Sequence, residues 1–257
     1  MIIAQLTDTH ILESKTESQS AAEQRISDLK RCILDIKNLP AKPDVVIHTG
    51  DIAHTADRKE YQVALELLKI LETPVFVVPG NRDSRSNIRQ VFSCSNYITG
   101  NRSEPIIYAI NNFEVRLIGV DSISPGSNKG YFCPEHLSTL DRLLSSFPEK
   151  PTAIFMHHPP IPIETGETNR VEFITKEAGD EFVSMILKHK QVIRVFCGHS
   201  HRAYLEKVGK IEFSTVPSIA SDLRLGKYPE RMEGVPVYQI HEFNPSSNFV
   251  SHTRLLV

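Results

Sequence analysis

The chain has 257 residues, of which 29 are basic and 31 acidic, so its formal net charge is -2. This length suffices for one large α/β domain with a substantial core, and the nearly balanced charge argues against a general polyanion-binding surface. The sequence contains no apolar run near the roughly 20 residues that a membrane span requires. We therefore expect a soluble, cytoplasmic protein without membrane contact, built as a single domain over residues 1–257.

The N-terminal stretch MIIAQLTDTH and the cysteines agree with this expectation. The stretch lacks a basic region and a small-residue cleavage site, so it is typical of a first strand rather than a signal peptide. The cysteines are far apart and show no CxxC spacing; they are Cys32, Cys94, Cys133 and Cys197. Free thiols in a reducing compartment are expected.

The first ninety residues alternate short apolar strands with amphipathic helices. Strands are expected at Ile2–Leu6, Asp44–His48 and Val75–Val78. Between them, apolar residues recur at helical spacing from Ala22 to Ile36 and from Tyr61 to Leu71. This alternation predicts βαβ units and a mainly parallel sheet.

The rest of the chain contains more strands than helices. Further helices are expected at Glu135–Phe147 and Ala178–His189. The expected strands are Ile106–Ile110, Val115–Val120, Thr152–Met156, Val192–Cys197, Tyr204–Val208, Ile211–Thr215, Val237–Phe243 and Phe249–Leu256. The pattern predicts two mixed sheets with helices outside, in which the C-terminal strands, from about residue 204 to 257, complete the second sheet.

Five expected strands end in polar residues of the kinds that bind metals. These ends are Asp8-Thr9-His10, Gly50-Asp51, Gly80-Asn81-Arg82-Asp83, His157-His158 and Gly198-His199-Ser200-His201. Because ligands bind beyond the carboxyl ends of the strands in an open α/β sheet, the five loops should converge. Together they offer enough carboxylate, carboxamide and imidazole groups for two metal ions.

The types and spacing of these residues suggest how the ions are held. Asp8 and His10 lie two apart on an extended segment, so their side chains can point to the same side. Asp51 is the candidate bridge, since a carboxylate can contact two cations. Mixed oxygen and imidazole ligands suit divalent Mn, Fe, Zn or Co better than Ca or Mg.

In this order, the motifs DxH, GD, GN followed by an acidic residue, a histidine after a strand, and GHxH resemble those of the calcineurin-like metallophosphoesterase superfamily. The resemblance spans nearly the whole chain and is closest to the class III cyclic nucleotide phosphodiesterases and glycerophosphodiesterases, for which MHHPP is also typical. It implies a four-layer α/β/β/α sandwich. It also implies two ligand sets: Asp8, His10, Asp51 and His201 for one metal, and Asp51, Asn81, His157 and His199 for the other.

The activity that the resemblance implies is hydrolysis of a small organic phosphodiester, of the cyclic nucleotide or glycerophosphodiester class. A hydroxide bridging the two metals would attack the phosphorus in line with the leaving alkoxide. Asp51, Arg82 and His158 are the candidate catalytic residues, and the last two are also candidates for substrate binding.

Arg82 departs from the family pattern, which has a histidine at this position. Arginine stays charged and offers a fork of donors, so it can hold phosphoryl oxygens but is a very poor proton donor. If Arg82 faces the site, leaving-group protonation must come from water or from another residue such as His158. The alternative is an exposed arginine turned away on a loop.

Two histidines and one loop each have two possible roles. His158 either contacts substrate or packs behind the ligands, held by Pro159 and Pro160. His54 stands where the family often has aspartate; it either orients a ligand or lies at the surface. The segment Ser214–Asp222 resembles a loop that closes one side of the substrate pocket, but it also reads as a strand end with turn residues.

Other functions remain as alternatives. Arg82 would favour a phosphomonoesterase by holding the dianionic ester. A metal-free interaction module is a second alternative, although it would gain little from keeping seven ligands. A nuclease would need a basic, aromatic-lined groove, which the charge and the lack of tryptophan do not favour. The terminal strand Phe249–Leu256 could pair across a homodimer or a higher homo-oligomer.

Overall fold

The computed structural model of the chain describes residues 1–13, 19–93, 97–101, 103–164 and 169–256. Its first third alternates strands and helices, as predicted, with one further helix, Arg85–Val91, that was not predicted. These elements are β1 (Ile2–Leu6), α1 (Gln19–Asn38), β2 (Val45–His48), α2 (Arg58–Leu68), β3 (Val75–Val77) and α3 (Arg85–Val91).

The predicted elements of the remaining chain occur in the predicted order with small shifts at their ends. This part of the chain contains β4 (Ile107–Ile110), β5 (Arg116–Val120), α4 (Pro134–Ser145), β6 (Thr152–Met156), β7 (Ile163–Glu164), β8 (Asn169–Arg170), α5 (Lys176–Ile186), β9 (Val192–Cys197), β10 (Tyr204–Val208), β11 (Ile211–Thr215), the 3₁₀ turns η1 (Ser221–Leu223) and η2 (Glu230–Met232), β12 (Val237–Asn244) and β13 (Asn248–Leu255). Of these, β7, β8, η1 and η2 were not predicted. Helix α5 begins before the predicted Ala178, because the Thr175 side chain accepts a hydrogen bond from the Ala178 N–H and caps the helix.

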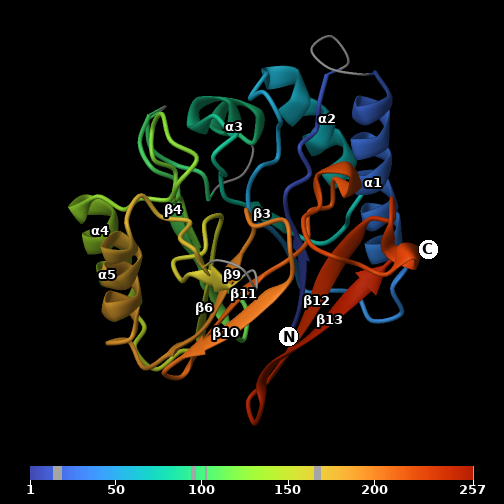
Figure 1. Cartoon of the computed structure of the whole chain (residues 1–257). Helices are drawn as coiled ribbons and strands as arrows, with labels where there is room; N and C mark the ends of the chain where they lie inside the picture. Colours follow the sequence, from blue (N-terminus) through green and yellow to red (C-terminus); the bar gives the residue numbers. More distant parts are fainter. Residues whose placement is uncertain (14–18, 94–96, 102, 165–168, 257) are drawn as a thin grey trace.

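Two mixed sheets face each other at the centre of the molecule (Figure 1). The strand order is β13-β12-β1-β2-β3 in the first sheet and β10-β11-β9-β6-β5-β4 in the second. Helices α1 and α2 cover one outer side, and α4 and α5 cover the other. The predicted four-layer α/β/β/α architecture is therefore confirmed.

The central strands of the first sheet, β1 and β2, are buried on both faces. Ile3, Ala4 and Leu6 of β1 are fully buried, and β1 pairs in parallel with β2 in the register Ala4↔Val46. Helix α1 packs Leu29 and Ile33 against this layer. Continuous burial explains why the strands read as uninterrupted apolar runs in the sequence.

The predicted place of the last two strands is wrong. Strands β10 and β11 do join the second sheet, but β12 pairs antiparallel with β1, in the register Ala4↔Ile240, and β13 pairs with β12. The physical reason is that β1 lies inside the fold and needs hydrogen-bond partners on both edges. Strand β13 is the edge strand, as the sequence suggested for the segment Phe249–Leu256.

The described residues also bear on the cysteines and on membrane association. Cys32, Cys133 and Cys197 are free thiols, and the first and last of them are buried; Cys94 falls outside the described residues. In the part of the chain that the structure covers, no helix has both the length and the apolarity to cross a bilayer.

Candidate metal centre

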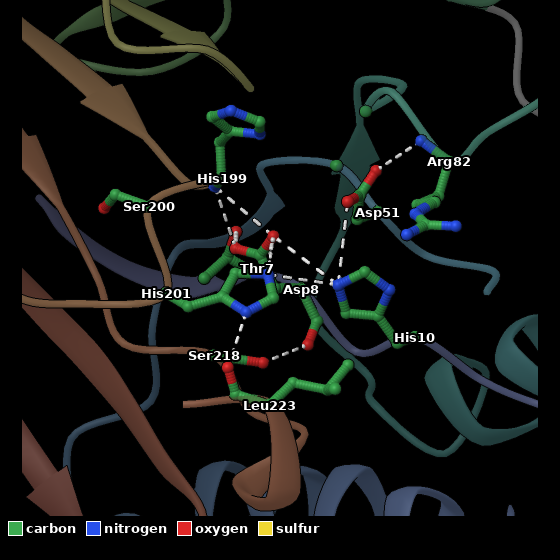
Figure 2. A network of polar contacts seen from close by, with 12 residues as sticks. Thr7, Asp8, His10, Asp51, Arg82, His199, Ser200, His201, Ser218 and Leu223 are labelled. Carbon is green, nitrogen blue, oxygen red and sulfur yellow. Dashed lines mark hydrogen bonds and ion pairs between the residues drawn. The ribbon is translucent and has the colours of Figure 1, made fainter. Parts of the chain in front are cut away.

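The five strand ends singled out in the sequence meet at one edge of the two sheets. Strands β1, β2 and β3 are parallel neighbours in the first sheet, and β6 and β9 are parallel neighbours in the second. Their carboxyl ends therefore point the same way, and Figure 2 shows Asp8, His10, Asp51, His199 and His201 gathered there. The fold brings together residues from nearly the whole length of the chain.

The backbone at this edge is conformationally unusual. Seven non-glycine residues of the described chain have positive φ, and five of them are candidate ligands: Asp8, His10, Asp51, His199 and His201, with φ between 42° and 67°. Such a left-handed conformation costs an L-residue about 1–2 kcal/mol. Strain concentrated in one group of residues indicates a functional constraint rather than a packing accident.

Glycines beside the candidate ligands allow the strand ends to approach one another closely. A Cβ atom on Gly80 would lie 2.2 Å from Asp51 Oδ1, and one on Gly198 would lie 2.7 Å from Asp8 Oδ2. Gly50 has φ +95°, and a Cβ there would lie 2.7 Å from His157 Nδ1. No larger residue fits these positions without moving a candidate ligand.

Four residues form what we call the Asp8 cluster: Asp8, His10, Asp51 and His201. Nε2 of His201 lies 3.2 Å from Asp8 Oδ1 and 3.2 Å from Nε2 of His10. Nε2 of His10 lies 3.6 Å from Asp51 Oδ2. All four side chains are buried or nearly so, and their donor atoms face a common point.

A second group, the Asn81 cluster, consists of Asp51, Asn81, His157 and His199. Oδ1 of Asn81 lies 3.0 Å from His157 Nε2 and 2.9 Å from His199 Nδ1. Asp51 Oδ2 lies 3.5 Å from His157 Nε2. The same Asp51 oxygen thus faces both clusters, whereas its other oxygen, Oδ1, accepts the Arg82 backbone N–H at 2.8 Å.

The ring nitrogens that face away from the clusters have partners of their own. Nδ1 of His157 lies 2.8 Å from the Thr49 carbonyl oxygen, and Nδ1 of His201 lies 2.7 Å from the Leu223 carbonyl oxygen. A carbonyl oxygen can only accept, so each Nδ1 carries a proton and each Nε2 is left to face its cluster. This arrangement is usual for metal-binding histidines.

The other two rings contact side chains instead. Nε2 of His199 lies 3.2 Å from the Glu172 carboxylate, and Nδ1 of His10 lies 3.3 Å from Nδ1 of His54. Burial alone would raise the pKa of Glu172, but its contact with His199 outweighs burial and lowers that pKa to about 2. Glu172 is therefore an ionised, buried carboxylate next to a candidate ligand.

The segment Ser214–Asp222 lies against the Asp8 cluster. Ser218 Oγ donates a hydrogen bond to the Asp8 carbonyl oxygen at 2.8 Å. Turn η1, which carries the Leu223 carbonyl, is attached to α1, because Asp28 Oδ2 accepts hydrogen bonds from both the N–H and the hydroxyl of Ser221. Helix α1 thus fixes the turn that orients His201.

Charge at the site is distributed between carboxylates and histidines. Burial raises the pKa of Asp8, but His201 outweighs it and lowers the pKa to about 2; burial also opposes ionisation of Asp51, yet His157 lowers its pKa below the usual range. Burial would lower the pKa of His157, but Asp51 raises it to about 9. Protons on histidines thus balance the carboxylates, and a bound cation would displace them.

The loop after β3 is held by Asp83. Its carboxylate accepts hydrogen bonds from the N–H groups of Gly80, Ile52 and Ala53 at 2.8–3.1 Å. Burial, and next to it the charge of Asp51, raises the pKa of Asp83 to about 7. Asp83 therefore joins the loop that carries Asn81 to the loop that carries Asp51.

The structure gives Arg82 an exposed side chain. Among the described residues its guanidinium has no hydrogen-bond or ion-pair partner, and in Figure 2 the side chain turns back toward Asp51 and His10. The guanidinium is therefore accessible to a ligand at the site. Whether it holds a phosphate stays a prediction.

His158 lies below the surface, not at the open side of the site. It is fully buried, its Nδ1 is 2.8 Å from Ser122 Oγ, and its Nε2 has no partner among the described residues. Its ring lies 4.5 Å from that of His199, centroid to centroid. Burial, with the charges of His199 and His157, lowers the pKa of His158 well below its usual range. This position favours the interpretation that His158 packs behind the ligands, because substrate contact would require the ring to move.

Comparisons with known proteins agree with this geometry. The family model described as calcineurin-like phosphoesterase matches residues 1–203. The chain is 33% identical to a probable glycerophosphodiester phosphodiesterase of Arcobacter nitrofigilis, over 98% of this chain and 92% of that protein. It is 28% identical to a probable cyclic nucleotide phosphodiesterase of Synechococcus, over 85% of this chain and 80% of that protein.

A solved structure has the same fold. A dimetal phosphatase from Danio rerio superposes with a TM-score of 0.75, covering 100% of this chain and 96% of the other, at 13% identity. The chain belongs to the calcineurin-like phosphoesterase family, as its motifs predicted, and its relatives are named as phosphodiesterases.

Proposed function

We propose that the protein is a binuclear metal-dependent phosphodiesterase that hydrolyses a small organic phosphodiester. The observation that carries the proposal is the position of Asp51 Oδ2, 3.6 Å from Nε2 of His10 and 3.5 Å from Nε2 of His157. One carboxylate oxygen between two groups of imidazole nitrogens is suited to bridging two cations. The identity with glycerophosphodiester and cyclic nucleotide phosphodiesterases supports a diester substrate of one of these classes.

The residues present fit two divalent cations. Ring nitrogens face each other at 3.2 Å in both clusters, between His10 and His201 and between His157 and His199. Such pairs need a proton or a cation between them, because two lone pairs repel. The Asp8 cluster would hold one ion and the Asn81 cluster the other, and mixed oxygen and nitrogen donors favour Mn, Fe or Zn.

In this proposal, the residues of the site have distinct roles. Asp51 aligns the two ion positions, and its Oδ1 is kept in place by the Arg82 N–H. The two cations would acidify a water molecule and stabilise charge on the attacking and leaving oxygens. The Arg82 guanidinium binds a phosphoryl oxygen. Because arginine is a very poor proton donor, water protonates the leaving group. His158 supports His199 from behind.

A phosphomonoesterase is the second candidate, favoured by the unpaired guanidinium of Arg82, which would attract a dianion. Initial rates on bis(p-nitrophenyl) phosphate and p-nitrophenyl phosphate, measured with Mn-loaded and metal-stripped protein, separate the two. A diester preference that stripping abolishes supports the proposal, and a monoester preference replaces it with the second candidate. Inactivity on both esters despite two bound metals would indicate an enzyme of narrow specificity, whereas inactivity without bound metal would indicate an interaction module.

We also propose a cytoplasmic location and a homodimer. The three free cysteines support a reducing compartment. Strand β13 lies at a sheet edge with Val250 46% exposed, and such an edge can pair with its copy in a second chain. Sedimentation at micromolar concentration, with a Ser251→Pro variant to block pairing along β13, tests the dimer.

A further inference from the structure

Glu172 is a charged residue buried beside the site that the sequence motifs do not contain. It is 2% exposed, and its carboxylate contacts three nitrogen-bearing side chains. Oε2 lies 3.2 Å from His199 Nε2 and 3.1 Å from Lys129 Nζ, and Oε1 lies 3.2 Å from Arg170 Nε. Burying a carboxylate is costly unless it is paired in this way.

The contact with His199 determines which ring nitrogen carries the proton. A carboxylate only accepts, so Nε2 of His199 must donate, and Nδ1 is left to face Asn81 Oδ1 at 2.9 Å. In the part of the chain that the structure describes, the other candidate ligand rings contact backbone carbonyls or, for His10, the ring of His54. Among these described rings, only that of His199 contacts a carboxylate from outside the two clusters.

A purely structural role for the carboxylate is not needed to join the two loops. Gly130 donates its N–H to the Glu172 carbonyl oxygen at 2.8 Å, and Ile174 donates its N–H to the Gly130 carbonyl oxygen at 2.9 Å. The main chain therefore already ties the segment around residue 130 to the segment around residue 172. The Glu172 side chain is therefore available to orient the His199 ring.

We propose that Glu172 is a positioning residue: it fixes the tautomer and ring orientation of His199 and thereby sets the affinity of the Asn81 cluster for its metal. Lys129 and Arg170 hold the charge of Glu172 in place. The inference rests on the proposed binuclear centre and adds a residue to it. Residues that orient metal-binding histidines typically change metal affinity 10–100-fold when they are replaced.

The test is calorimetric titration of the metal-free protein with Mn²⁺, using wild type, Glu172→Gln and Glu172→Leu. Both variants should bind one of two ions about 10–100-fold more weakly and leave the other unchanged. In a His201→Ala background, which impairs the Asp8 cluster, Glu172→Leu should weaken the remaining ion. In a His157→Ala background, Glu172→Leu should cause little further loss of metal affinity. Glu212→Gln, which removes a carboxylate paired with Arg194 away from the site, is the matched control and should not alter either affinity.

A second readout needs neither metal nor turnover. Nitrogen-15 NMR of the histidine rings in the metal-free protein should show His199 protonated at Nε2 in wild type and as a mixture of tautomers in Glu172→Leu. Unchanged tautomer and unchanged affinities in a folded variant would overturn the positioning role alone. If wild type binds fewer than two ions, the proposed binuclear function fails, and this inference fails with it.

Discussion

The backbone N–H of Arg82 donates a hydrogen bond to Oδ1 of Asp51 at 2.8 Å. This contact does not involve the guanidinium, so the Arg82 side chain can be replaced while the loop stays in place. Substitutions of Arg82 can therefore test how replacing the family's histidine with arginine affects activity.

Arg82→His should keep both metals and change the preference for esters. Loss of a charge-assisted hydrogen bond to phosphate, about 1.5–3 kcal/mol, should lower kcat/KM for p-nitrophenyl phosphate roughly 10–100-fold. The loss of kcat/KM should be smaller for the diester, because the diester carries one negative charge fewer. Steady-state kinetics on both esters measure this, with metal content as the control; equal losses on the two esters would argue against phosphate contact by Arg82.

Asp51 and His10 should differ in how many ions depend on them. Asp51→Asn removes the oxygen that faces both clusters, so metal content should fall from two ions to nearly none. His10→Ala affects only the Asp8 cluster and should leave one ion. Elemental analysis after dialysis against trace metal distinguishes these outcomes, and equal stoichiometry in the two variants would refute the bridging role of Asp51.

Asp28 should matter to the metal site although it lies on α1. Asp28→Ala leaves the N–H and hydroxyl of Ser221 without their acceptor, which costs about 1–3 kcal/mol of folding stability and frees the turn that orients His201. The metal affinity of the Asp8 cluster should fall as well.

The matched control on the same helix is Asp35→Ala. Asp35 pairs with Arg254 and accepts a hydrogen bond from Tyr238, away from the site. Thermal melting of the metal-free proteins and Mn²⁺ titration should show lower stability in both variants, but weaker metal binding only in Asp28→Ala. Weaker metal binding in both variants would mean that a general loss of folding stability, and not the Ser221 contact, lowers the metal affinity.

The buried thiols should be unreactive in the folded protein. Burial raises the pKa of Cys32 and of Cys197 far above the usual thiol range, and the thiolate is the reactive form. In a Cys94→Ser, Cys133→Ser variant, a disulfide reagent at pH 8 should label neither thiol until denaturant is added. Labelling of the native protein within minutes would show that the core opens far more often than its packing suggests.

Most of the candidate site could be predicted from sequence because its residues follow apolar strands. Continuous apolar runs such as Thr152–Met156 and Val192–Cys197 end where the structure ends β6 and β9. Polar residues placed after such runs must emerge at the sheet edge. Chain order and strand direction then suffice to bring them together.

The residues that hold the ligands could not be predicted in the same way. Glu172 reaches His199 from a loop 27 residues away along the chain, and Leu223 reaches His201 from a 3₁₀ turn 22 residues away. No periodicity relates a loop carboxylate to a histidine so far away. The partner of β12 was mispredicted for a similar reason, since an alternating strand pattern specifies a face but not a neighbour.

The pairing of β12 with β1 makes the order of synthesis important. The strand that leads into Asp8 and His10 is synthesised long before residues 237–244, which form one of its two neighbours. Contacts between such distant segments form late in folding. A nascent chain that stops short of residue 237 therefore has an incomplete first sheet, and we expect the two clusters to assemble only after β12 has been synthesised.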